Sequence, residues 1–126
     1  MAPPRLLRGL ANPQLAVALR RIHAYANASL SVPDLARSAG MSRSVFFNRF
    51  CNNIGMAPME YVTAWRMSLA KDMLRQGGLT SSEIASRVGY GSASAFSMAF
   101  FRRMGTSLQA YAEAAHEPPE AMDFAH

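Results

Sequence analysis

The stretch SRSVFFNRF, residues 42–50, combines features of a helix core with features of a recognition surface. Phe46, Phe50 and Ile54 follow one another at intervals of four, so a helix that begins at Ser42 would turn all three toward one side. The opposite side of that helix would carry polar and basic side chains. The stretch therefore predicts a helix that is anchored by phenylalanine and that exposes a polar face.

A second segment of the chain repeats this pattern. Residues 92–100 read SASAFSMAF, and five positions of the first segment and its continuation recur 50 residues later. The recurring pairs are Ser42 and Ser92, Phe46 and Phe96, Phe50 and Phe100, Gly55 and Gly105, and Tyr61 and Tyr111. Each copy reads as a short capped helix, a glycine-containing turn and a longer helix, which is the helix-turn-helix unit. A helical hairpin repeated in a small bundle can also be purely structural.

Capping residues and stop glycines predict an all-α fold with seven helices and no strand signal. Asn12 before Pro13 marks the first start, and capping boxes are expected at Ser31 with Asp34 and at Thr80 with Glu83. The expected helices cover about 13–26, 32–39, 43–54, 58–76, 81–88, 92–104 and 107–114.

These helices predict two helix-turn-helix subdomains joined by a long linker helix. The expected divisions are a linker or remnant at 1–11, the first subdomain at 12–57, the linker helix at 58–76, the second subdomain at 77–114 and a flexible tail at 115–126. The linker helix would be about 28 Å long at 1.5 Å per residue. A rod of that length would hold two recognition helices on adjacent major grooves about 34 Å apart, without dimerisation. Its stripe of Tyr61, Trp65, Leu69 and Met73 is interpreted as core.

The distribution of charge favours a polyanionic partner. The net charge is +5, all thirteen Lys and Arg residues precede residue 104, and four of the eight acids lie in the last fourteen residues. Residues 1–112 therefore carry thirteen basic and four acidic groups, a net +9. Nucleic acid is the first candidate partner and an anionic membrane the second, although such charge can also serve solubility alone.

No catalytic or metal-binding arrangement is visible in the sequence. Cys51 is the single cysteine, which excludes a disulfide within the chain and a cysteine-based zinc site. The three histidines are scattered, and no segment has the length of a signal peptide core or a bilayer span. We therefore expect a cytoplasmic protein that is not an enzyme and has no cofactor or metal.

The polar face of the helix after Ser42 carries groups that can read bases. Arg43 can donate to guanine and Asn48 to adenine, Ser44 can bond to either, and Phe47 can contact a thymine methyl group. Arg43 and Arg49 can equally be phosphate contacts or ordinary solvated charges.

Four segments together resemble the DNA-binding domain of the AraC/XylS-type transcription regulators of bacteria. They are LARSAGMSRSVFFNRF (35–50), GMAPMEYVTAWRMSLAKDML (55–74), LTSSEIASRVGYGSASAF (79–96) and GTSLQAY (105–111). The resemblance covers about residues 12–112 and implies two helix-turn-helix subdomains joined by a long helix. It also implies sequence-specific binding to promoter DNA, contact with RNA polymerase and an upstream effector domain, which the eleven residues before Asn12 are too few to form.

By position, the resemblance assigns candidate residues to both recognition helices. Base reading is expected from Arg43, Ser44, Phe47 and Asn48 in the first helix and, less securely, from Ala93, Ser94, Ser97 and Met98 in the second. Phosphate contacts are expected from Ser42, Arg49, Ser92, Arg102 and Arg103. The partner would be double-stranded DNA, bound by a monomer or a weakly self-associating chain.

The second half departs from the family pattern. Met98 and Phe101 stand where arginine and lysine are common, Leu108 replaces a proline, Ala112 replaces an arginine, and Asn48 stands in the first half where arginine is frequent. An exposed Met98–Phe101 pair is therefore interpreted as a protein contact or a decayed DNA site. The alternative function is a helical protein-interaction module, or a DNA-binding-defective relative that titrates a regulator or RNA polymerase.

Overall fold

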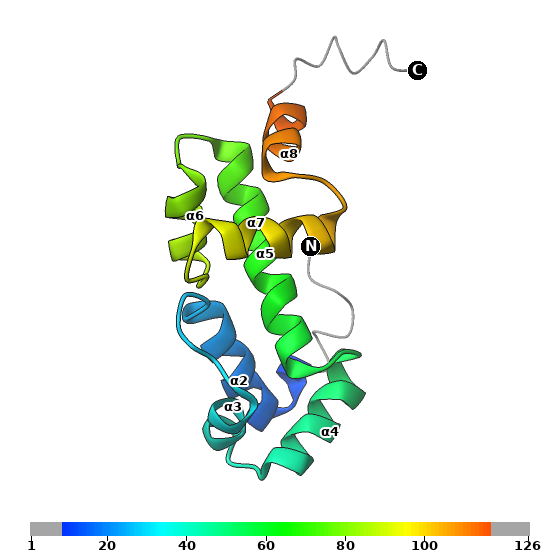
Figure 1. Ribbon diagram of the computed structural model, residues 1–126. Helices are drawn as coiled ribbons and strands as arrows, with labels where there is room; N and C mark the ends of the chain where they lie inside the picture. Colours follow the sequence, from blue (N-terminus) through cyan, green and yellow to red (C-terminus); the bar gives the residue numbers. More distant parts are fainter. Residues whose placement is uncertain (1–8, 117–126) are drawn as a thin grey trace, which may run out of the picture. The chain divides into compact units, whose positions relative to one another are not determined.

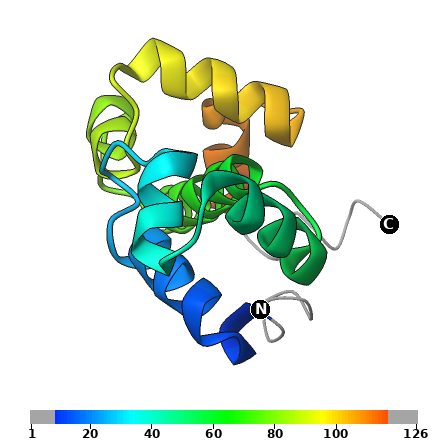
Figure 2. The same cartoon turned by 90° about the horizontal axis from the view of Figure 1, so that it is seen from below.

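The computed structural model describes residues 9–116, and every regular element within them is a helix, as predicted (Figures 1 and 2). The chain forms two compact units, Met1–Arg66 and Met67–His126, and each unit is described by itself. The helices are α2 (Pro13–Ala24), α3 (Val32–Ala39), α4 (Arg43–Ile54), α5 (Pro58–Gln76), α6 (Ser81–Arg87), α7 (Ala93–Met104) and α8 (Leu108–Ala115).

The predicted count of seven helices is too low by one. Residues 9–11, which fall in the range expected for a linker or remnant, are also helical. A side chain at Gly9 would meet Ile54 and Leu19, so the helix packs closely against the first unit at this point. The rest of the expected linker, residues 1–8, lies outside the described part of the chain.

A polar side chain caps the start of six of the predicted helices, all except α5, which Ala57 precedes. The Asn12 side-chain oxygen accepts the backbone N–H groups of Gln14 at 3.0 Å and Leu15 at 3.1 Å, and Pro13 follows as the first helical residue. Such caps bond backbone donors that have no partner inside the helix, which stabilises the start. The chemistry of single residues therefore positioned these helix starts correctly.

The two expected capping boxes differ. At the start of α6, the Thr80 hydroxyl accepts from the Glu83 N–H at 3.1 Å, and the Glu83 carboxylate accepts from the Thr80 N–H at 2.9 Å. This backbone hydrogen bond lowers the pKa of the Glu83 carboxyl. At the start of α3, the Asp34 carboxylate instead accepts the Ser31 hydroxyl at 2.8 Å. Aspartate is one methylene shorter than glutamate, so this box is not completed.

The turn inside the first helix-turn-helix ends α3 and starts α4. Gly40 has φ 69°, a left-handed conformation that suits glycine, and the Met41 N–H bonds back to the Ala36 carbonyl at 3.0 Å. The Ser42 hydroxyl then caps α4. Figure 2 shows α3 and α4 joined by this short connection.

Helices α2, α3 and α4 and the first half of α5 enclose the core of the first unit. Its fully buried cluster has thirteen residues: Leu15, Ala18, Leu19, Ile22, Leu30, Leu35, Ala36, Ala39, Phe46, Phe50, Ile54, Tyr61 and Val62. The aromatic rings form a chain in which Phe50 lies 5.6 Å from Phe46 and 5.8 Å from Tyr61. The predicted anchor residues of the first recognition helix are therefore core residues.

The second unit repeats this arrangement with a smaller core. Its buried cluster has seven residues: Met67, Ala70, Ile84, Ala85, Val88, Phe96 and Phe100. Phe100 lies 6.0 Å from Phe96 and 5.6 Å from Tyr111, so the aromatic chain of the first unit recurs 50 residues later.

Helix α5 occupies the range expected for the linker, and its two halves complete two different cores. Tyr61 and Val62 are buried in the first unit, whereas Met67 and Ala70 are buried in the second. In the predicted stripe, Tyr61 is buried, while Trp65, Leu69 and Met73 are half-buried against these clusters. The boundary between the units thus falls within α5, between Arg66 and Met67.

A histidine and a tyrosine connect α2 to α5 in the first unit. His23 Nε2 lies 2.6 Å from the Tyr61 hydroxyl, and the His23 ring is 4.1 Å from the Trp65 ring. Burial lowers the pKa of His23 and raises the pKa of Tyr61, because both charged forms lose hydration.

Helix α8 extends one residue into the range expected for the flexible tail. Ala115 is the last residue of α8, and His116 Nε2 lies 3.0 Å from the Leu74 carbonyl oxygen. Residues 117–126 lie outside the described part of the chain.

Candidate nucleic-acid interface

Helix α4 is held with one face inside the first unit and the other in solvent. The Ser42 hydroxyl accepts the Val45 N–H at 3.3 Å, and Phe46, Phe50 and Ile54 are buried. Because these three side chains fix the rotation of the helix about its axis, the remaining side chains are presented to solvent in a defined order.

The four residues predicted to read bases all lie on the exposed side of α4. Arg43, Ser44, Phe47 and Asn48 are each exposed, and the Phe47 side chain is 42% accessible. They line a shallow groove with Val32 and Pro33 from the start of α3. The contribution of α3 could not be read from the helical period of α4, because it depends on how the two helices pack.

The predicted phosphate contacts of the first unit are also on the surface. Arg49 is exposed, and its Nη1 atom lies 3.5 Å from the Gln14 Oε1 atom at the start of α2. Ser42 is exposed while its oxygen caps α4, so its hydroxyl proton can still be donated.

Helix α7 is built in the same way. The Ser92 hydroxyl accepts the Ala95 N–H at 3.1 Å, and Phe96 and Phe100 are buried. Of the four residues predicted to read bases in this helix, Ser94 and Met98 are exposed, whereas Ala93 and Ser97 are half-buried. The structure therefore places only half of the second predicted set fully on the surface. Ser92, Arg102 and Arg103 are exposed.

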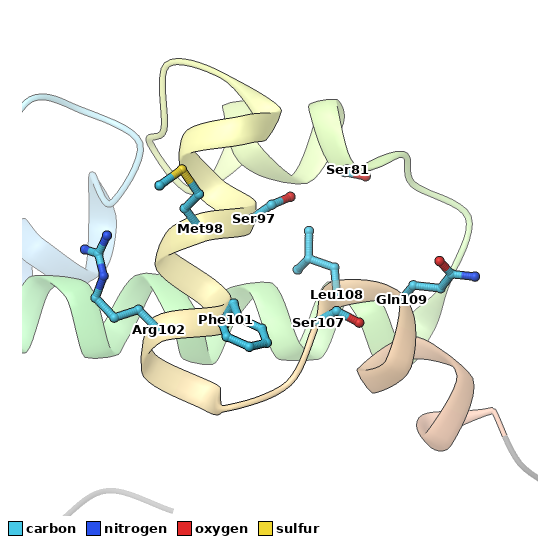
Figure 3. Close-up of a pocket in the computed structure, with 8 residues that line it drawn as sticks. All are labelled: Ser81, Ser97, Met98, Phe101, Arg102, Ser107, Leu108 and Gln109. Carbon is cyan, nitrogen blue, oxygen red and sulfur yellow. The ribbon is translucent and has the colours of Figure 1, made fainter.

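A groove of about 650 Å³ lies beside α7. It is lined by Ser81, Ser97, Met98, Phe101, Arg102, Ser107, Leu108 and Gln109 (Figure 3). In Figure 3, Ser97 and Phe101 lie on the side of α7 toward Leu108, whereas Met98 and Arg102 lie on the other side. The lining residues from α6 and α8 were not predicted, because they come together only when these helices pack around α7.

Both recognition helices present a surface without negative charge. Neither α4 nor α7 contains an acidic residue. Nearby acids have local partners: Asp34 pairs with Arg37, Asp72 pairs with Arg75, and Glu83 bonds to the start of its own helix. The exposed arginines of α4 and α7 can therefore meet an anion without a competing carboxylate on the same helix.

Within 9–116, no three His, Cys, Asp or Glu side chains come together in a way that could hold a metal ion. None of the helices described there is both long and apolar enough to cross a bilayer.

A family described as a helix-turn-helix domain matches residues 35–114, which is more than half of the chain and includes both recognition helices. Together with the relatives described next, this match shows that the chain belongs to the AraC-type helix-turn-helix family. The family consists of DNA-binding transcription regulators, which are not a class of enzymes. The predicted family is thus confirmed.

Bacterial proteins and solved structures resemble the chain over most of its length. A Streptomyces lividans protein named as an AraC-like transcription regulator is 48% identical over 99 residues, which are 79% of this chain and 33% of that protein. The C-terminal domain of AraT, a response regulator from Geobacillus stearothermophilus, has a TM-score of 0.78 at 26% identity, covering 85% of this chain and 89% of that one.

The DNA-binding domain of AdpA was solved in complex with a target DNA. It has a TM-score of 0.73 at 30% identity, over 81% of this chain and 91% of that domain. The chain spans about a third of the length of the curated relatives it matches, as with the HTH-type regulator AlkR of Acinetobacter baylyi, of which it covers 36%.

Proposed function

We propose that the chain is a sequence-specific, double-stranded DNA-binding module of a transcription regulator, and that α4 is its principal base-reading helix. One observation carries this proposal: Arg43, Ser44, Phe47 and Asn48 are all exposed on a helix whose opposite face is buried and which contains no acid. A helix of this kind suits the major groove, where distinct base edges can be read by its side chains.

Each side chain has a separate chemical role in the proposal. Arg43 donates two hydrogen bonds to guanine, and Asn48 forms a two-point contact with adenine. Ser44 bonds to either base, and Phe47 contacts a thymine methyl group. Arg49 and the Ser42 hydroxyl hold phosphates and so set the register of the helix on the duplex.

The second unit binds a second half-site in this proposal. The support is the repetition of the capped, phenylalanine-anchored helix in α7, together with exposed Arg102 and Arg103 for phosphate contacts. Since the outer residues of α4 and α7 differ, the complete site is not a palindrome. One chain then reads both half-sites without dimerising, in the cytoplasm of a bacterium, and RNA polymerase is the proposed second partner.

Selection of bound duplexes from a random pool tests the proposal. The wild-type chain should enrich a defined site, and Arg43→Ala and Asn48→Ala should each relax one base preference by about 1–3 kcal/mol. Asn52→Ala is a matched control, since Asn52 is an exposed asparagine one turn further along α4 and outside the predicted set. An unenriched wild-type pool would contradict the proposed function, and unchanged preferences in both variants would contradict the proposed residues.

Salt dependence provides an independent measurement. Binding through phosphates releases counterions, so affinity should fall steeply as salt rises. Arg49→Ala and Arg102→Ala should reduce the slope by about one each without changing the selected sequence, whereas loss of a base contact changes the selected sequence.

A further inference from the structure

The exposed face of α7 carries two large apolar side chains. Met98 is 62% accessible and Phe101 is 59% accessible, although both lie on a helix that buries two phenylalanines on its other face. Exposure of one such side chain is ordinary, but two on adjacent turns of one helix form an apolar patch whose contact with water is unfavourable. This patch has no role in the hydrogen-bonding contacts proposed above.

The internal repeat places this patch on the line that reads DNA in the first unit. Ser94, Met98 and Phe101 are spaced at i, i+4 and i+7, so their directions around the helix axis fall within about 60° of one another, with Phe101 nearer to Leu108 and Met98 farther from it. Fifty residues earlier, the same line in α4 is occupied by Ser44, Asn48 and Cys51. Ser44 and Asn48 belong to the proposed base-reading set, whereas Cys51 is half-buried and outside it, so Met98 stands where the first unit has Asn48 and Phe101 stands one turn further along the same line.

Exposed apolar side chains gather on the two recognition helices. In the described part of the chain, the large apolar residues with exposed side chains are Leu10, Val17, Tyr25, Val45, Phe47, Met98 and Phe101. Four of these seven lie on α4 or α7, although the two helices together have only 24 of the 108 described residues. Apolar contact is therefore a shared property of both helices, and in α7 it dominates.

The charge around the patch favours DNA over an apolar protein partner. Arg102 and Arg103 follow Phe101 directly, both are exposed, and α7 has no acidic residue. The groove beside the patch adds the polar side chains of Ser107 and Gln109 from the start of α8. A surface that combines apolar side chains with arginines and neutral donors matches the major groove of DNA. Thymine methyl groups and hydrogen-bonding base edges form the floor of that groove, and phosphates line its two sides.

The major groove offers one apolar group that distinguishes bases, the C5-methyl group of thymine. We propose that α7 reads its half-site through Met98 and Phe101, which contact thymine methyl groups in place of hydrogen-bonded base edges. The flexible methionine adapts to the position of a methyl group, and the flat phenylalanine ring covers one from the side. This inference rests on the proposed function, because it names what the second recognition helix reads within the same DNA site.

Deoxyuridine differs from thymidine only by this methyl group, so it provides the test. Once the selected site is known, each thymine of the second half-site is replaced by deoxyuridine. Each methyl group that Met98 or Phe101 contacts should reduce wild-type affinity about fourfold when it is removed. The doubly substituted M98A/F101A variant should bind the thymine and deoxyuridine duplexes equally well.

Two matched variants control the measurement. Tyr25→Ala removes another large exposed side chain, which lies at the end of α2 in the other unit, and it should retain the full loss on deoxyuridine substitution. Phe47→Ala should lose methyl sensitivity in the first half-site only. Met98 and Phe101 are exposed, so their truncation should preserve the fold, which circular dichroism checks.

The outcomes separate this inference from the proposed function. If the wild-type chain selects a specific site but deoxyuridine in the second half-site has no effect, the inference is wrong and the proposed function stands. The inference also fails if the DNA affinity of M98A/F101A remains as sensitive to deoxyuridine as that of the wild type. It fails as well if M98A/F101A binds DNA like the wild type and loses only the binding of another protein. If no sequence is selected at all, the proposed function itself fails.

Discussion

The two units use one arrangement of buried residues to present two different surfaces. Phe46 and Phe50 anchor α4, and Phe96 and Phe100 anchor α7 at the same spacing. The outer line of α4 is polar, whereas that of α7 is apolar at Met98 and Phe101. Packing therefore fixes the buried positions of a helix-turn-helix and leaves its outer positions free to change chemistry.

The units also differ in the size of their cores and in their charge. The first buries thirteen residues in its cluster and the second seven. In residues 9–66, six arginines and two acids give +4, and in residues 67–116, five basic and three acidic residues give +2. The first unit therefore has both the larger apolar contribution to stability and the stronger attraction for DNA.

The largest expected effect concerns these cores. Phe50→Ala and Phe100→Ala should each destabilise their own unit by about 3–5 kcal/mol, because each leaves a cavity among aromatic rings. The second unit should lose more of its native signal, since its buried cluster is smaller. Denaturant titration followed by amide hydrogen exchange measures both effects. Phe47→Ala and Phe101→Ala are exposed controls, and equal destabilisation by controls and core variants would contradict the assignment of anchors.

Replacing an exposed polar residue of α4 by the residue at the equivalent position of α7 tests the difference between the two surfaces. Asn48→Met should remove an adenine preference in the first half-site and reduce discrimination by about 1–3 kcal/mol, because methionine cannot replace the two-point contact. Competition between duplexes that differ at that base measures the change. Retained adenine preference in the variant would show that Asn48 does not read the base.

Both helix-turn-helix turns place a glycine at positive φ, Gly40 at 69° and Gly89 at 92°, and the second turn contains a further glycine, Gly91, that is not of this kind. Gly40 has φ 69°, and the nearest atom to an added Cβ is Gln14 Nε2 at an ordinary contact distance of 3.8 Å, so Gly40→Ala should cost about 1–2 kcal/mol through backbone strain alone. In the second turn, Gly91 has neither a positive φ nor a close neighbour, so Gly91→Ala should leave stability unchanged or slightly raised. Thermal unfolding compares the two, and a neutral Gly40→Ala would contradict the strain argument.

The smallest expected effect is a pH dependence confined to the first unit. Tyr61 and Tyr111 are equivalent in the repeat, but the Tyr61 hydroxyl faces His23, whereas the Tyr111 hydroxyl accepts a hydrogen bond from Arg75 at 2.9 Å. Burial lowers the pKa of His23 below its ordinary 6.5, so the unfolded chain binds the proton more readily. This contribution to stability is complete above pH 6.5 and decreases as the pH falls below it.

Amide exchange in α2 and α4, measured as a function of pH, checks this expectation after correction for the intrinsic pH dependence of exchange. His23→Phe should remove the decrease in stability of the first unit below pH 6.5. A decrease of the same size in the variant would assign the effect to other groups.

Much of the fold could be predicted because its signals are local. Asn12, Ser42 and Thr80 cap helices through bonds to residues two or three positions away, and the four anchor phenylalanines follow the helical period. The exposure of Arg43 and Asn48 followed from the same period. The errors arose where longer-range or finer geometry decides the outcome. Residues 9–11 are helical where Gly9 lies against Ile54, a residue distant in the sequence. The expected capping box at Ser31 is not completed, because Asp34 is one methylene shorter than a glutamate.

The sequence alone therefore determined the helices, their repetition and the identity of the buried anchors, since these depend on spacing within one helix and on the chemistry of each cap. Tertiary structure decided which outer residues become neighbours. The period of α7 could not indicate that Leu108 and Gln109 from α8 line a groove beside Phe101, or that Ser97 is half-buried. Such neighbours come from different helices, and only the packing of whole helices, which minimises exposed apolar surface, brings them together.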